Sequence, residues 1–134
     1  KLEINYERVD MDRLGCDDDT LKERYKNAMV AYITGPLLFA NTNVLEELPE
    51  KVADCDTMLL SMRGVSSIDV SAVQTLLPIL RQLKEKGVTI MICGLPPASM
   101  SMISRAGITD LLGENAFYWS VEKALLENHS EAKG

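Results

Sequence analysis

The chain has 134 residues, of which 46% are hydrophobic and 25% charged, and this size and balance suit one globular domain with its own core. A formal net charge of −6 and a pI near 4.8, with no basic patch in the sequence, argue against a nucleic-acid partner. Three cysteines without paired spacing argue against a disulfide framework or a metal site, and they favour a reducing cytosolic setting.

Neither a membrane span nor a signal peptide is predicted. The longest apolar stretch, residues 28–40, is interrupted at Thr34, Gly35 and Pro36 and is shorter than the roughly 20 residues that cross a bilayer. Residues 1–28 contain no apolar signal core. The chain begins without an initiator Met, which hints at a piece of a longer protein, although a trimmed tag would look the same.

Residues 1–28 are predicted to form a charged leader or linker. Few large apolar groups occur there, so we expect the segment to contribute little to a core. Leu2, Ile4 and Tyr6 alternate with polar residues, which indicates an edge strand near the start. The run 17–19, three aspartates, lacks the spacing of a calcium-binding loop and is interpreted as a solvated charge cluster.

A first strand and a first helix are predicted next. Residues 29–35 are rich in strand-forming side chains and end at a Gly-Pro breaker, which indicates a strand. Asn41 or Thr42 then caps a helix that ends at Val52, and Pro49 is expected to distort or shorten it. The side chains expected on its inner face are Val44, Leu45 and Leu48.

Two nearly continuous apolar runs, 57–62 and 88–95, indicate strands that are covered on both faces, as in a parallel sheet. Between them lies a helical pattern that ends at Gly87 and is expected to kink at Pro78. The apolar face of this helix comprises Val73, Leu76, Leu77, Leu80 and Leu83.

The last part of the chain is predicted to hold a short helix over 98–106, a short strand over 116–119 and a helix over 121–128. Residues 129–134 are expected to be a polar tail, in which His129 is solvated. Met100, Met102 and Ile103 are interpreted as core residues, and Phe117 and Trp119 as seals at the sheet edge.

The alternation of strands and helices predicts an α/β fold, with a mostly parallel central sheet of about four to five strands flanked by helices. Strands that alternate with helices are joined by right-handed crossovers in such sheets.

The strand-to-helix turn at residues 66–72 carries the functional signal. Ser66, Ser67, Asp69 and Ser71 follow a strand and surround a helix N-terminus, where α/β proteins place ligands and partners. Two interpretations of its capping stay open. Ser71 caps the helix while Gln74 reaches back to the Ser71 amide, or Asp69 is the cap and Ser71 lies in the first turn.

The turn and the element order resemble the STAS domain, a fold shared by anti-sigma factor antagonists and the cytosolic tails of SulP-type anion transporters. The resemblance covers residues 29–128 and includes the strand end Arg63-Gly64-Val65 and the motif Ile68-Asp69-Val70-Ser71. In the antagonists, a partner kinase phosphorylates the serine that matches Ser71. The family often has Gly directly after this serine, and here Ala72 stands there, so its Cβ is expected to hinder a kinase.

The resemblance implies a non-catalytic regulatory and protein-interaction domain of a SulP-type transporter, located in the cytoplasm beneath the inner (plasma) membrane. Its partners would be the membrane domain of the same chain and a cytosolic protein, and it would form oligomers through the parent transporter. A phosphate on Ser71 would add about −1.5 to −2 charges beside a docked partner and expel it, with Asp69 adding repulsion. The alternative is a free-standing anti-sigma factor antagonist regulated at Ser71.

No catalytic motif supports an enzyme. The sequence has no nucleophile elbow, phosphate-binding loop or dinucleotide fingerprint, and its one histidine lies in the polar tail. We therefore predict no cofactor and no metal. The resemblance to some family members still allows a nucleotide or small anion to bind at the strand ends near Ser66, Ser71, Gly94 and Leu95.

Overall fold

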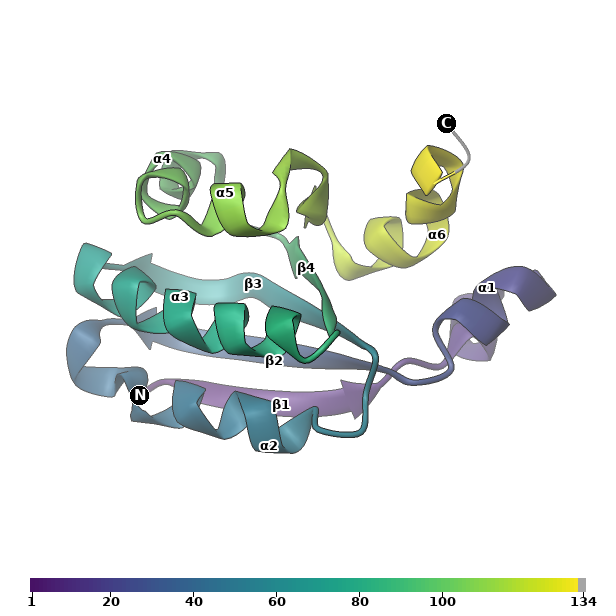
Figure 1. Cartoon of the computed structure of the whole chain (residues 1–134), viewed down its shortest axis with the longest axis horizontal. Coiled ribbons are helices and arrows are strands. Elements are labelled where there is room, and N and C mark those ends of the chain that lie inside the picture. Colours follow the sequence, from purple (N-terminus) through teal and green to yellow (C-terminus); the bar gives the residue numbers. More distant parts are fainter. Residues whose placement is uncertain (133–134) are drawn as a thin grey trace.

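Five strands form one sheet in the computed structural model of the chain, which describes residues 1–132 and the side chains of residues 1–127. The strand order is sequential from β1 to β5; β1 runs antiparallel to β2, and every other neighbouring pair is parallel (Figure 1). This confirms the predicted α/β fold class. The strands are β1 (Glu3–Arg8), β2 (Ala28–Leu37), β3 (Thr57–Ile68), β4 (Thr89–Cys93) and β5 (Phe117–Tyr118).

Helices border the sheet on both faces. The 3-10 segment η2 and helices α2 and α3 pack over one face of β2 and β3, and α1 and α6 contact each other beside the opposite face. Among the described residues, no helix has both the length and the apolar character needed to cross a bilayer. The α-helices are α1 (Asp19–Arg24), α2 (Leu48–Lys51), α3 (Val70–Glu85), α4 (Pro97–Arg105), α5 (Ile108–Leu112) and α6 (Val121–Ala132); the 3-10 helices are η1 (Met11–Leu14), η2 (Phe39–Glu47) and η3 (Glu114–Ala116).

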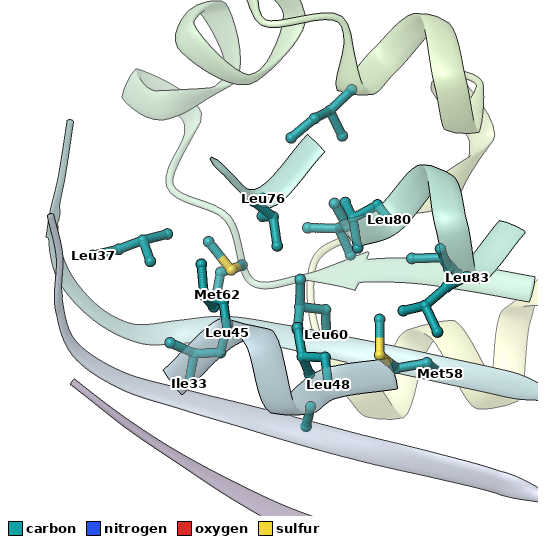
Figure 2. Packing of buried hydrophobic residues seen from close by; sticks show 14 of the residues in the cluster. Ile33, Leu37, Leu45, Leu48, Met58, Leu60, Met62, Leu76, Leu80 and Leu83 are labelled. Carbon is teal, nitrogen blue, oxygen red and sulfur yellow. The ribbon is translucent and has the colours of Figure 1, made fainter. Parts of the chain in front are cut away.

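The main core lies between the sheet and α3. Figure 2 shows leucines of α3 pointing toward β3, with η2 and α2 closing the side. Each fully buried leucine is worth about 1.5–3 kcal/mol relative to exposure, so this layer anchors the end of β3 against the start of α3. The core residues labelled there are Ile33, Leu37, Leu45, Leu48, Met58, Leu60, Met62, Leu76, Leu80 and Leu83, all less than 2% exposed.

A second core on the opposite face includes residues from the start of the chain. Met11, Leu21 and Tyr25 are buried against β-strand residues such as Leu59 and Met91. The expectation that residues 1–28 contribute little to a core is therefore wrong. The charge-rich sequence hid these side chains because each is isolated among polar and charged residues, and burial of one face of α1 needs no long apolar run.

The segment after β2 differs from the predicted helix. It is a 3-10 helix that begins at Phe39, followed by the single-turn α2, because Pro49 lies at the start of α2 and cannot donate a backbone hydrogen bond within a longer helix. Neither Asn41 nor Thr42 is its N-cap. Asn41 Nδ2 instead donates to the Pro36 carbonyl, and Thr42 Oγ1 donates to the Phe39 carbonyl.

Strands β2 and β3 continue beyond their predicted ends to Leu37 and Ile68. Their pairing passes two register shifts, so that Ser67 lies opposite Pro36 and Ile68 opposite Leu37. Gly64 permits this close pairing: a Cβ there would lie 2.6 Å from Thr34 Cγ2 and 3.0 Å from the Ile33 carbonyl oxygen. As a result, Ser66 and Ser67 belong to the strand and not to the turn.

The C-terminal part contains more helix than predicted. Helix α5 was not expected, and α6 continues past Asn128 to Ala132.

Phe117 packs against the core, but Trp119 is 65% exposed, so it does not seal the sheet edge. Ile103 is fully buried, as predicted. The expectation for the His129 side chain, and for the chain from residue 133 on, lies outside the described residues.

The buried thiol of Cys93 gives the stability of the fold a pH dependence. Burial, aided by the nearby Glu122 carboxylate, raises the thiol pKa from 9.0 to about 12. Between about pH 9 and 12 only the unfolded chain loses this proton, so the free energy of unfolding falls by up to about 1.4 kcal/mol per pH unit. Below about pH 9 the contribution is fully present.

We expect Cys93→Ala to flatten the fall in unfolding free energy measured by urea denaturation between about pH 8 and 10.5. The control is Cys16→Ala, which changes a half-buried thiol of the same chain. The pKa values of Tyr6, Tyr32 and Cys55 are also raised, so the wild-type slope includes them. The difference between the two variants isolates Cys93, and equal slopes would contradict the prediction.

Candidate functional site

Asp69 organises the turn between β3 and α3. Its Oδ1 accepts a hydrogen bond from the Ala72 amide at 2.8 Å, which makes Asp69 the N-cap of α3. Its Oδ2 accepts from the Phe39 amide at 3.2 Å, and its own amide donates to the Leu37 carbonyl. The Ser71 capping box is therefore wrong, and the alternative with Asp69 as the cap is confirmed.

Ser71 lies in the first turn of α3 with an exposed side chain. Its carbonyl accepts a hydrogen bond from Thr75 Oγ1 at 3.1 Å. Free backbone amides and the positive end of the helix dipole occur at such a position, so a negative group on Ser71 would be tolerated by the fold. Access to Ser71 is open on the solvent side.

Ala72 has the opposite orientation. It is fully buried in the main core, so its methyl group faces the sheet and not a partner that approaches Ser71. The expected hindrance of a kinase by the Ala72 Cβ is therefore wrong. Because α3 turns by about 100° per residue, the side chain next to an exposed serine can point inward.

Ser66 and Ser67 line a separate small cavity. The cavity has a volume of about 200 Å³ and lies between the end of β3 and the start of α4. Its walls combine these two serines and Ser99 with apolar groups, and Leu95, which the sequence indicated as part of a strand-end site, is among the apolar groups. The lining residues are Met62, Val65, Ser66, Ser67, Ile68, Leu95, Pro96 and Ser99.

The structure thus divides the predicted turn into two neighbouring surfaces. Ser66 and Ser67 belong to the cavity beside α4, whereas Asp69 and Ser71 belong to the start of α3 beside η2. Gly94 does not line this cavity and borders another one, on the α6 side of the sheet. A cavity of this size suits an apolar side chain of a partner better than a nucleotide.

Two exposed apolar side chains flank Asp69, and the sequence did not single them out. Phe39 is 63% exposed and Val70 is 50% exposed. Exposed apolar side chains that lie close together mark interaction sites, whereas singly scattered ones are common on any domain. Their neighbourhood follows from the hydrogen bond between the Phe39 amide and Asp69, the residue before Val70. We call Phe39, Val70 and Ser71 the turn surface. A phenylalanine separated by one residue from the polar run 41–43 was the available sequence signal.

The chemistry of the turn surface favours contact over catalysis. Both carboxylate oxygens of Asp69 accept backbone amides, so they hold two loops together instead of facing a substrate. Neighbouring exposed apolar groups suit a protein interface, and a phosphate on a hydroxyl inside such an interface would disrupt it.

Known proteins that this chain resembles include members of the STAS domain family and a probable sulfate permease. The STAS domain family profile matches residues 20–124. A probable sulfate permease of Schizosaccharomyces pombe is 30% identical over 112 residues, which cover 70% of this chain and 17% of the permease. The chain therefore spans about a sixth of the length of that curated relative.

Solved structures of transporter STAS domains share the fold. The STAS domain of a SulP transporter from Vibrio cholerae superposes with a TM-score of 0.63 and 26% identity, covering 79% of this chain and 83% of that domain. The murine anion transporter Slc26a9 matches with a TM-score of 0.65 and 20% identity over 81% of this chain and 20% of the transporter. The latter likeness concerns the fold alone.

Proposed function

The chain belongs to the STAS domain family, and from this premise we propose that it is the cytosolic regulatory and protein-interaction domain of a SulP-type anion transporter. It acts without catalysis of its own. The resemblance to a probable sulfate permease and to a SulP transporter STAS domain supports the assignment. The observation that carries the regulatory part is the exposed turn surface, in which Phe39 and Val70 flank the Asp69 cap.

The partner of the turn surface is the membrane domain of the same transporter. Lys1 lies against Gly35 near the end of β2, because a Cβ on Gly35 would lie 2.3 Å from the Lys1 carbonyl oxygen. Figure 1 places the N-terminus at the end toward which β2 and β3 point, which is also where the turn surface lies. The first residues of the chain therefore lie at the same end of the sheet as the turn surface.

Charge supports the same partner. The domain has a formal net charge of −6, whereas cytoplasmic loops of membrane proteins carry an excess of Lys and Arg. Complementary charge speeds encounter and fixes orientation, while the apolar pair supplies contact area that is removed from water. A phosphate on Ser71 would place about −1.5 to −2 charges inside this contact and release it.

We expect Phe39→Glu and Val70→Glu each to weaken binding of the isolated domain to the solubilised membrane domain by about tenfold or more, because each buries a charge in the contact. Biolayer interferometry measures the dissociation constant. Both side chains are exposed, so folding stability should change by less than about 0.5 kcal/mol.

The matched control is Leu126→Glu, which replaces another exposed apolar residue, on α6. It should leave the dissociation constant unchanged. If Phe39→Glu, Val70→Glu and Leu126→Glu all bind with the same dissociation constant, the turn surface is not the contact. Binding to an anti-sigma factor in place of the membrane domain would instead support a free-standing antagonist.

A further inference from the structure

A second surface of the sheet, on the side of α6, carries polar residues at positions where the other side is apolar. Tyr32, Ser61 and Cys93 are paired across β2, β3 and β4, so their side chains share one face. The next row along the strands on that face is Val30, Leu59 and Met91, which is apolar and buried. The Ser61 side chain and the Tyr32 hydroxyl therefore interrupt an otherwise apolar face, and Cys93, which belongs to the second core, completes this row, which we call the polar row.

The opposite face of the same strands is apolar, so the fold does not require polar residues at these positions. There the rows adjacent to the polar row consist of aliphatic residues, including Ala31, Leu60 and Ile92, which are all buried in the main core. A sheet covered by helices on both faces is expected to be apolar on both. Ser61 and Cys93 are only 7% and 1% exposed, so they occupy core positions with a polar hydroxyl and a thiol.

The polar row faces a cavity of about 270 Å³. This cavity lies where β4 ends and α6 begins, and in open α/β sheets ligands bind beyond the carboxyl ends of the strands. It is somewhat smaller than the pockets that hold drug-sized molecules, which suits a small metabolite. Its lining residues are Tyr32, Ile33, Thr34, Ser61, Arg63, Gly64, Cys93, Gly94, Ser120, Val121 and Glu122.

Two opposite charges border the cavity. Arg63 is held in place because its guanidinium donates to the Trp119 carbonyl at 2.8 Å and lies 5.8 Å from the centre of the Trp119 ring. A guanidinium has five N–H donors, so further donors remain for a ligand carboxylate. Glu122, in the first turn of α6, is close enough to raise the pKa values of both Tyr32 and Cys93.

We propose that this cavity binds a small zwitterion of the size of a free amino acid, whose carboxylate meets Arg63 and whose ammonium group meets Glu122. The hydroxyls of Ser61, Ser120 and Tyr32 supply the remaining hydrogen bonds. A simple anion would be repelled by Glu122 and a simple cation by Arg63, so the charge pair selects a ligand that carries both signs. An adjoining cavity of about 210 Å³ shares Tyr32, Val121 and Glu122 and gives room for a longer side chain.

Isothermal titration of the isolated domain with L-serine tests the proposal. We expect saturable binding, together with a rise in the unfolding temperature when L-serine is in excess. N-acetyl-L-serine, which lacks the ammonium group, and ethanolamine, which lacks the carboxylate, should bind at least about tenfold more weakly. Glycerol should not bind.

Arg63→Gln and Glu122→Gln should each weaken L-serine binding by about tenfold or more, since each removes one charged hydrogen bond. Both side chains are exposed, and the control is Arg81→Gln, an exposed residue of α3. The absence of heat with L-serine, equal binding of glycerol, or unchanged affinity in both cavity variants would overturn the proposal. These results are independent of the turn surface, because no cavity residue belongs to it.

Discussion

Replacement of Asp69 by alanine is expected to lower the free energy of unfolding by about 1.5–3 kcal/mol. Loss of an N-cap costs about 0.5–2 kcal/mol, and loss of the second hydrogen bond, from the Phe39 amide, adds about 1 kcal/mol. The reason is that one carboxylate accepts from Ala72 and Phe39 at once, at 2.8 and 3.2 Å. Urea denaturation followed by circular dichroism measures the change.

The variant Asp69→Asn separates the two hydrogen bonds. An amide side chain has one acceptor oxygen, so it can keep one of the two contacts and should lie between wild type and Asp69→Ala. Asp17→Ala is the matched control, because Asp17 is exposed in the loop between η1 and α1. A loss of less than about 0.5 kcal/mol in Asp69→Ala would show that the cap does not hold the turn.

The central sheet could be predicted from the sequence because its central parallel strands have a recognisable apolar pattern. The runs 57–62 and 88–95 are apolar without alternation, and a pattern of this length is typical of a strand covered on both faces. The face of α3 was predictable for the same reason, since Leu76, Leu80 and Leu83 recur at helical spacing and are all buried.

Contacts between distant segments could not be predicted in this way. The extension of β3 to Ile68 depends on pairing with Pro36 and Leu37 of β2, and local sequence at Ser66 and Ser67 favours a turn. The choice of Asp69 over Ser71 as the cap depends on the Phe39 amide, which lies 30 positions earlier in the chain. Local rules allow both residues to cap, and the tertiary contact selects one.

The candidate site was located by its position in the fold and not by its apolar residues. Ser71 and Asp69 were found because they follow a strand and open a helix. Phe39 and Val70 were missed because exposure is a property of the folded surface, and a sequence pattern assigns large apolar residues to the interior. The same limit hid the polar row on β2, β3 and β4, which becomes visible only in the strand register.

The substitution Ser71→Asp is expected to weaken binding to the membrane domain by about tenfold or more without loss of folding stability. A negative charge in the first turn of a helix stabilises it by about 0.3–1 kcal/mol, and repulsion from Asp69 offsets part of this gain. In the docked state the same charge would be buried beside Phe39 and Val70, where it lacks a partner. Biolayer interferometry and urea denaturation of the same protein measure the two effects.

Ser71→Ala distinguishes this switch from a structural role. The Ser71 hydroxyl is not the cap of α3, so its removal should change the unfolding free energy by less than about 0.5 kcal/mol. The dissociation constant for the membrane domain should stay unchanged. Gln82→Glu, which adds a charge on an exposed position at the far end of α3, is the control for charge alone. Unchanged binding of Ser71→Asp, while Phe39→Glu still weakens it, would leave the contact in place and exclude Ser71 as its switch.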